Sequence, residues 1–215
     1  MKKIAIYGAG GFGREVACLI HKINERESEW KLVGFFDDDV SLKGSMISHY
    51  APCLGGIDVL NSVNDDLAVV IAIGNPSAMK GVINRILNPL ISFPNIIHPD
   101  FKTVDPLTFQ IGKGNIIQGG CYASCDVKIG DFNVLNGSDV LGHDVILGNF
   151  NSLMPAVRVS GKVHIGDDNF FGVGSIVLQG VHIGHGISLS AGSVLLTKPQ
   201  NGLLYMGNPA KKIVF

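Results

Sequence analysis

The residues best suited to chemistry in this sequence are a histidine and the aspartate that follows it, in the run Gly142-His143-Asp144. An imidazole has a pKa near neutral pH, so it can take a proton from an attacking amine or hydroxyl group. A carboxylate beside it can orient the ring and stabilise its charged form. The pair could therefore serve as a general base, although a histidine at an exposed turn is more often a solvated side chain.

A glycine-rich loop near the N-terminus forms a second candidate site: Gly8-Ala9-Gly10-Gly11-Phe12-Gly13-Arg14. It follows the apolar run 2–7 and precedes a helical pattern of apolar residues, Val16, Leu19, Ile20 and Ile23. In this strand–turn–helix context, glycines allow a phosphate to approach the backbone, and the helix N-terminus stabilises its charge. The loop alone would suggest NAD, but it serves any pyrophosphate.

Two further expected strands end in polar residues. The run 32–36 ends at Asp37-Asp38-Asp39, and the run 67–73 ends at Gly74-Asn75, before an expected helix over 77–87. Strands that alternate with helices predict a small parallel sheet with its ligand at the carboxyl edge. A carboxylate there could accept hydrogen bonds from a ribose or a base. Because this half has only about 90 residues, a mononucleotide or nucleotide-sugar fits it better than a dinucleotide.

The second half of the chain carries a six-residue repeat. Every sixth residue from Ile111 to Leu195 is apolar: Ile111, Ile117, Ala123, Ile129, Leu135, Leu141, Leu147, Leu153, Val159, Ile165, Phe171, Val177, Ile183, Leu189 and Leu195. This period fits neither an α-helix nor an alternating strand. It is typical of a triangular parallel β-helix, in which three hexapeptides form one coil and the apolar residues point inward. We expect the glycines that follow many of these residues, such as Gly148, to relieve strain where the backbone turns.

This register places Gly161 directly above His143, because the two lie one 18-residue coil apart. His185 has the same position in its hexapeptide as His143, so the register leaves the choice of base open. His164 and His182 also stack one coil apart, but a zinc hydrase needs three converging histidines. We interpret His164, His182 and His185 as solvated side chains and predict no metal site.

The repeat divides the chain into an α/β Rossmann-like domain over 1–92, a proline-punctuated linker over 93–106 and a β-helix with a C-terminal tail over 107–215. We expect His98 to pack or hydrogen-bond at the junction of the two domains. With 46% hydrophobic and 16% charged residues, the chain can bury a sizeable core.

Composition also limits the possible partners and compartments. A formal net charge of -1 gives no electrostatic reason to bind nucleic acid. The apolar run after Lys2 and Lys3 is ended by Gly8, so we expect neither a signal peptide nor membrane insertion. The four cysteines lack C-x-x-C spacing, which favours reduced thiols and a cytoplasmic protein.

Taken together, the motifs resemble those of bacterial hexapeptide-repeat sugar acyltransferases, of the sialic acid O-acetyltransferase and UDP-4-amino-sugar N-acetyltransferase types. The resemblance spans the chain, through the glycine loop, Asp37-Asp38, Ile97-His98-Pro99, Gly142-His143-Asp144, the hexapeptides and Gly207-Asn208-Pro209-Ala210-Lys211. It implies a left-handed β-helix, acetyl-CoA as co-substrate and a homotrimer that binds acetyl-CoA between neighbouring prisms.

The resemblance also implies roles for individual residues. His143 would be the base, Asp144 its orienting partner and Gly161 the backbone donor to the oxyanion. The acceptor, a nucleotide-linked amino sugar, would contact Gly8, Gly10, Gly11, Phe12, Gly13, Asp37, Asp38 and Asn75. Acetyl-CoA would contact Ser152, Gly172, Gly174 and the tail motif Gly207, Asn208, Pro209, Ala210 and Lys211.

The chain departs from the amino-sugar N-acetyltransferases at two positions near the acceptor. Phe12 replaces a histidine of the glycine loop, and Ser152 replaces a second histidine in the coil after His143. N-transfer and O-transfer to a sugar of the sialic acid type therefore both stay open. The alternatives from other classes are an NAD-dependent oxidoreductase, a zinc-dependent hydrase and a scaffold that does not bind CoA.

Overall fold

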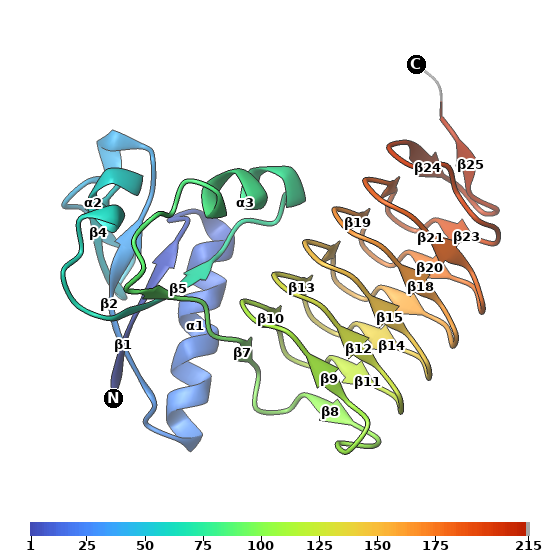
Figure 1. The fold of residues 1–215 in the computed structure, drawn as a ribbon, viewed down its shortest axis with the longest axis horizontal. Helices are drawn as coiled ribbons and strands as arrows, with labels where there is room; N and C mark the ends of the chain where they lie inside the picture. Colours follow the sequence, from blue (N-terminus) through green and yellow to red (C-terminus); the bar gives the residue numbers. More distant parts are fainter. Residues whose placement is uncertain (214–215) are drawn as a thin grey trace. The chain divides into compact units, whose positions relative to one another are not determined.

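The computed structural model describes residues 1–213 and divides the chain into two compact units, Met1–Pro99 and a second unit that begins at Asp100 (Figure 1). Each unit has its own hydrophobic core. Among residues 1–213, no helix combines the length and the apolar character that crossing a bilayer requires.

The first unit is built around a twisted sheet with the strand order β3-β4-β2-β1-β5-β6. The parallel strands are β1 (Lys2–Tyr7), β2 (Trp30–Phe36), β4 (Ala51–Gly55), β5 (Leu67–Ile71) and β6 (Ile91–Ser92), and β3 (Met46–Ile47) pairs with β4 in the antiparallel direction. The helical segments are α1 (Gly11–Arg26), η1 (Val40–Leu42), α2 (Ile57–Asn61) and α3 (Pro76–Ile83). The Rossmann-like arrangement predicted for this half is confirmed, and it brings the loops after β1, β2, β4 and β5 to one edge.

Some element bounds differ from the prediction. The helix expected over 77–87 ends at Ile83. After it, Arg85 N–H donates to Val82 O and Ile86 N–H to Ile83 O, so each bond reaches back three residues instead of the four of an α-helix. The sequence pattern did not predict β3, β4 or α2. The short strand β7 (Ile96–Ile97) precedes the end of this unit.

The second unit is a parallel β-helix with three faces, as predicted. One face carries β10 (Ile116–Ile117), β13 (Val134–Leu135), β16 (Ser152–Leu153), β19 (Phe170–Phe171), β22 (Ser188–Leu189), β24 (Leu204–Met206) and the antiparallel β25 (Lys211–Lys212). The next face carries β8 (Lys102–Thr103), β11 (Tyr122–Ala123), β14 (Val140–Leu141), β17 (Arg158–Val159), β20 (Ile176–Val177) and β23 (Val194–Leu195). The third carries β9 (Gln110–Ile111), β12 (Lys128–Ile129), β15 (Ile146–Leu147), β18 (His164–Ile165) and β21 (His182–Ile183).

The hexapeptide register explains the core of this unit. From Ile117 to Leu195, every predicted inward residue is buried, and only Ile111 in the first coil is partly exposed. The coil begins earlier than the repeat, since β8 lies within the segment 93–106 that we expected to be a linker. Tyr122 pairs with Lys102, 20 residues earlier, whereas the later coils have 18 residues, so this first coil contains two extra residues.

The corners of the β-helix use a backbone conformation that the sequence did not reveal. Every sixth residue from Gly114 to Gly192 has a positive φ, including non-glycine residues such as Asp144 (φ 58) and Lys162 (φ 58). These positions lie three residues after each inward apolar residue. The expectation that the glycine directly after the apolar residue relieves backbone strain is therefore wrong.

Those glycines are required by the close stacking of the coils. A Cβ on Gly148 would lie 2.6 Å from the carbonyl oxygen of Gly166, one coil further along. A Cβ on Gly166 would lie 2.5 Å from the carbonyl oxygen of Gly184. No side chain fits between backbones at this distance, so glycine is selected for space and not for φ.

One inner corner is held by a ladder of buried asparagines, Asn115, Asn133, Asn151 and Asn169. The Asn133 side-chain oxygen accepts hydrogen bonds from the backbone and side-chain N–H groups of Asn151, at 2.9 and 3.0 Å. The Asn151 amide also donates to Gly166 O at 2.9 Å. Because each amide is satisfied on both sides, the ladder joins successive coils without leaving a buried polar group unpaired.

A buried acid occupies the corresponding position at another corner. Asp139 is fully buried, and its Oδ1 accepts a hydrogen bond from Val157 N–H at 2.8 Å. Its Oδ2 is buried and has no hydrogen-bond partner among the described residues. Burial raises the pKa of Asp139 to about 8, although the Val157 hydrogen bond acts in the opposite direction. Burial likewise raises the pKa of the Cys121 thiol, one coil below, to about 11.

Candidate active site

The catalytic pair predicted from the sequence lies at the corner between β14 and β15. His143 Nδ1 and Asp144 Oδ2 are 2.7 Å apart, and both side chains are about half exposed. An ionised carboxylate only accepts hydrogen bonds, so His143 Nδ1 carries the donating proton. In the neutral ring this leaves the Nε2 lone pair free to accept a proton.

Backbone hydrogen bonds to both neighbouring coils fix this corner. Asp144 N–H donates to Cys125 O at 3.1 Å, and Lys162 N–H donates to His143 O at 2.8 Å. Asp144 occupies the positive-φ position of its hexapeptide. The pair is therefore held on a rigid element, as precise proton transfer requires.

Gly161 lies against the His143 ring, as the register predicted. A Cβ on Gly161 would lie 2.4 Å from His143 Nε2 and 2.6 Å from Cε1. The Gly161 N–H donates to no acceptor among residues 1–213. A Cβ on Gly142 would lie 2.6 Å from Gly161 N. Because residue 142 is glycine, no side chain of its own covers the Gly161 amide.

At another of the three corners, the one that carries Lys113 and His185, the backbone N–H at the same hexapeptide position is paired. There, each equivalent backbone N–H donates to a side chain of the next coil. The pairs, donor first, are Lys113 to Asp131, Asp131 to Asn149, Asn149 to Asp167, Asp167 to His185, and His185 to Asn201. The corner that carries His143 lacks such side chains within the described coils. It therefore leaves a backbone donor free beside the imidazole.

The same comparison separates the two histidines that the register left equivalent. His185 Nδ1 accepts a hydrogen bond from Asp167 N–H at 2.9 Å. In the neutral ring, the proton then sits on Nε2, so the ring has no free lone pair to act as a base. His143 has the opposite arrangement and is the better candidate for a base.

His164 and His182, which stack one coil apart, lie on the third face of the β-helix. The His164 and His182 rings meet edge to face, with their centroids 4.7 Å apart on exposed strands. Within residues 1–213, no three His, Cys, Asp or Glu side chains lie close enough together to hold a metal ion.

The tail motif is attached to the last full coil. Gly207 N–H donates to Ser193 Oγ at 3.0 Å, and its carbonyl accepts from Val194 N–H. Ala210 N–H donates to Val194 O at 2.8 Å, so the segment 207–210, with a cis Asn208–Pro209 bond, folds back on the corner before β23.

The remaining residues expected to contact CoA have different surroundings. Gly174 is a positive-φ corner residue, and a Cβ added to it would meet open space. A Cβ on Gly172 would lie 2.4 Å from Ala191 N, which gives this glycine a packing role. Ser152 is fully buried in β16, and its hydroxyl has no hydrogen-bond partner among the described residues. Its hydroxyl is therefore not presented to solvent.

In the first unit, the glycine loop connects β1 to α1. Gly8 has φ 109, and a Cβ on Gly13 would lie 1.9 Å from Gly8 O, so both glycines are needed to close the turn. Gly10 caps α1, and a Cβ on it would meet open space, whereas a Cβ on Gly11 would have only the end of the Arg14 side chain nearby, at 4.0 Å. The helix therefore begins with accessible backbone at Gly10 and Gly11, and Phe12 is half-buried beside them.

Asp37 and Asp38, the first two of the three acids after β2, already accept hydrogen bonds from the protein itself. Asp37 accepts hydrogen bonds from Ala9 N–H at 2.8 Å and from Asp39 N–H at 3.0 Å. Asp38 Oδ1 accepts from Tyr7 Oη at 2.6 Å, and Asp38 Oδ2 lies 2.6 Å from Arg85 Nη2. These bonds connect the glycine loop, the loop after β2 and the segment after α3.

Electrostatics agree with this arrangement. Burial would raise the pKa of Asp38, but the hydrogen bonds from Tyr7 and Arg85 outweigh it and lower that pKa. Burial, together with the Asp38 carboxylate, raises the pKa of the Tyr7 hydroxyl above its usual range. The sequence pattern missed Tyr7 and Arg85, because nothing in their spacing connects them to Asp38. Asn75 caps α3 by accepting from Ala78 N–H at 2.9 Å.

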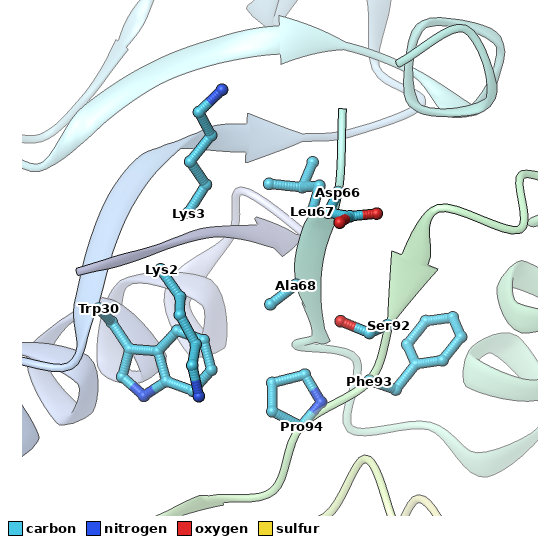
Figure 2. Close-up of a pocket in the computed structure, with 9 residues that line it drawn as sticks. All are labelled: Lys2, Lys3, Trp30, Asp66, Leu67, Ala68, Ser92, Phe93 and Pro94. Carbon is cyan, nitrogen blue, oxygen red and sulfur yellow. The ribbon is translucent and has the colours of Figure 1, made fainter. Parts of the chain in front are cut away.

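A cavity of about 530 Å³ in the first unit lies at the opposite, amino edge of the sheet (Figure 2). Lys2 lies over the Trp30 ring there, with Nζ 5.6 Å from the ring centroid, and Ser92 and Pro94 line the other side. None of the predicted site residues lines this cavity. A smaller cavity of about 260 Å³, formed by the segments 38–43 and 55–59, lies at the carboxyl edge.

Comparisons with known proteins fit this geometry. Residues 3–86 match the family model of the PglD N-terminal domain. The chain is similar to the acetyltransferase domain of PglB from Neisseria gonorrhoeae FA1090 in complex with acetyl coenzyme A, at 28% identity and a TM-score of 0.86, covering 99% of each chain. No curated protein sequence matches the chain.

Two more solved structures are similar over the full length. One is PerB from Caulobacter crescentus in complex with CoA and GDP-perosamine, at 26% identity and a TM-score of 0.88, covering 100% of this chain and 98% of PerB. The other is WeeI from Acinetobacter baumannii AYE, at 26% identity and a TM-score of 0.88, covering 99% of this chain and 100% of WeeI.

Proposed function

We propose that this chain, a hexapeptide-repeat sugar acyltransferase, transfers an acetyl group from acetyl-CoA to the amino group of a nucleotide-linked amino sugar. The observation that carries the proposal is the corner at His143, where a free Nε2 and an unpaired Gly161 N–H lie side by side. The similarity to PglB with acetyl-CoA and to PerB with CoA and GDP-perosamine supports the donor and the class of acceptor.

The proposed reaction is a direct attack without an acyl-enzyme. The neutral amine of the sugar attacks the thioester carbonyl carbon, and His143 Nε2 takes the proton that the nitrogen loses. The Gly161 N–H donates to the oxyanion of the tetrahedral intermediate. When the C–S bond breaks, the imidazolium returns the proton to the leaving thiolate, which gives the amide and free CoA. Asp144 keeps the ring in the tautomer that this cycle needs.

The binding residues are assigned by the same proposal. The nucleotide-sugar pyrophosphate would bind the open backbone at Gly10 and Gly11, where the N-terminus of α1 favours an anion. Gly174 and the segment 207–211 would contact acetyl-CoA. Ser152 is better explained as a packing residue than as a CoA contact, because it is fully buried.

We also propose that the active enzyme is a homotrimer with acetyl-CoA between neighbouring β-helices. Several large apolar side chains of the β-helix are exposed in the single chain, among them Val173 (52%) and Leu178 (40%). Burial of such a surface favours association. Light scattering should report three chains per particle, and a monomer with full activity would overturn a shared site.

The test is thiol release from acetyl-CoA by the purified protein. The acceptors are UDP-, dTDP- and GDP-linked 4-amino sugars and free sialic acid. Release that requires an amino sugar, falls on the order of 100-fold or more in His143→Ala and persists in His182→Ala would support the proposal. His182 is the matched control because it is an exposed histidine of the same β-helix. Release with sialic acid alone would reassign the protein to O-acetylation, and no release with any acceptor would reject the proposal.

A further inference from the structure

The cavity of about 260 Å³ at the carboxyl edge lies where a parallel sheet of this kind binds the nucleoside part of a ligand. Its walls are the loop after β2, residues 38–43, and the turn from β4 into α2, residues 55–59. In the sheet order, β2 is next to β1, whose loop offers the open backbone for a pyrophosphate, and β4 lies on the other side of β2. The cavity is therefore on the β2 side of the proposed phosphate site.

The lining suits a flat, partly apolar group. Val40, Ile57 and Val59 contribute apolar surface, and Val40 is 88% exposed. Gly55 is buried, and a Cβ on it would lie 2.7 Å from the Val59 side chain and 3.8 Å from the stem of Lys43, so both side chains lie close to this turn. A purine or pyrimidine ring would cover the apolar side chains that now face solvent.

Two side chains of opposite charge, Lys43 and Asp58, line the same cavity and have no partner among the described residues. Lys43 and Asp58 form neither a hydrogen bond nor an ion pair through their side chains with any described residue, each other included. Asp38, the other acid of the lining, is fully engaged by Tyr7, Arg85 and Ile57 N–H. The carboxylate available to a ligand is therefore Asp58, and the available cation is Lys43.

These two groups discriminate among the bases. A carboxylate accepts best from two adjacent N–H donors, and guanine, through N1–H and its N2 amino group, is the common base that presents such a pair. The O6 and N7 atoms of guanine are acceptors that suit a lysine. In uracil and thymine the single N3–H lies between two carbonyl oxygens, which a carboxylate would repel.

We infer that Asp58 and Lys43 recognise a guanine base, and that the acceptor is a GDP-linked amino sugar. This inference rests on the proposed function and narrows its substrate class. The carboxylate of Asp58 would accept from guanine N1–H and N2–H, and the Lys43 ammonium would donate to O6 or N7.

The experiment measures binding of free nucleoside diphosphates by calorimetry, so that it does not depend on acetyl transfer. GDP should bind on the order of tenfold more tightly than UDP, dTDP or CDP. GDP should also bind more tightly than inosine diphosphate, which lacks only the N2 amino group. Asp58→Asn should remove the preference of GDP over inosine diphosphate, and Lys43→Gln should weaken both nucleotides alike.

The controls separate this inference from the proposed function. His143→Ala should keep the GDP preference while losing thiol release. Asp65→Asn, which changes an exposed acid outside this cavity, should leave all the affinities unchanged. Tighter binding of UDP or dTDP, or a GDP preference that survives in both Asp58→Asn and Lys43→Gln, would overturn the guanine assignment. An enzyme that acetylates a UDP-linked sugar would overturn it too, and would leave the acetyltransferase proposal standing.

Discussion

The substitution Gly161→Ala tests the geometry of the active corner most directly. The new Cβ would lie 2.4 Å from His143 Nε2, 2.6 Å from Cε1 and 2.8 Å from Cδ2. Ordinary contact between such atoms is roughly 3.5 Å, so the ring must move by about 1 Å. Gly161 does not have a positive φ, so alanine fits the backbone and the strain falls on the imidazole.

The expected consequence is a loss of rate with little loss of folding. A displacement of about 1 Å can cost on the order of 100-fold in rate, because the base no longer meets the attacking amine in line. The side chain of His143 is half exposed, so the ring can swing toward solvent, and the structure should remain folded. We therefore expect kcat to fall on the order of 100-fold in the thiol-release assay, with a thermal midpoint within a few degrees of the parent.

The matched control is Gly81→Ala. It introduces the same methyl group in α3, where no atom lies within 4 Å, and should leave kcat unchanged while stabilising the helix slightly. A Gly161→Ala enzyme with the parent kcat would refute the assignment of His143 as the base, since the ring could not keep its present position. A Gly161→Ala variant that unfolds would be uninformative on its own, so circular dichroism precedes the kinetics.

Asp144→Asn should lower kcat by about tenfold or more with little change in KM, because the ring loses the acceptor that fixes its tautomer; steady-state kinetics tests this. Asn151→Ala should lower the free energy of unfolding by about 2–5 kcal/mol, since it leaves buried partners of the asparagine ladder unpaired, and a urea denaturation series with an unchanged midpoint would contradict it. The Asp139 pKa is raised in the folded state to about 8, so its contribution to stability is complete below the unfolded pKa near 4 and is lost as the pH rises toward 8. Asp139→Asn should therefore raise the thermal midpoint at pH 8 more than at pH 5, and equal shifts at both would argue against a buried titrating acid.

The β-helix could be predicted from the sequence because one physical requirement repeats along it. Each hexapeptide places one side chain inside a narrow prism, so the inward position from Ile117 to Leu195 must be apolar. The Rossmann-like unit was recognised from the glycine loop and the alternation of strands and helices. The short elements β3, β4 and α2 were missed because they carry no periodic pattern of their own.

The corners were harder to predict, because the backbone there is decided by stacking and not by residue type. Asp144 and Lys162 adopt positive φ without being glycine, whereas Gly148 and Gly166 have ordinary φ and are glycine because the next coil is too close. A single sequence shows that glycine is present but not which neighbour excludes a side chain. The distinction appears only when the coils are in register.

The choice among candidate site residues depends on which polar groups the fold leaves unsatisfied. Asp37 and Asp38 stand at the expected ligand edge, yet their oxygens are taken by Ala9, Tyr7 and Arg85. Hydrogen bonding to such groups contributes to folding, and a ligand would have to displace them at a cost comparable to what it gains. A site built by evolution to bind a polar ligand needs groups that stay open in the free protein.

The same criterion favours one of two histidines that look alike in sequence. His143 and His185 share a hexapeptide position, but in the neutral ring only His143 keeps an Nε2 lone pair, because Asp144 accepts from its Nδ1 while Asp167 N–H donates to Nδ1 of His185. Gly161 keeps a free N–H at a position where the neighbouring corner fills every equivalent donor with a side chain from the next coil. An unfilled donor next to an unfilled acceptor is the arrangement that a tetrahedral oxyanion and a departing proton require. It is this pairing, more than the histidine alone, that supports the proposal of His143 as the base.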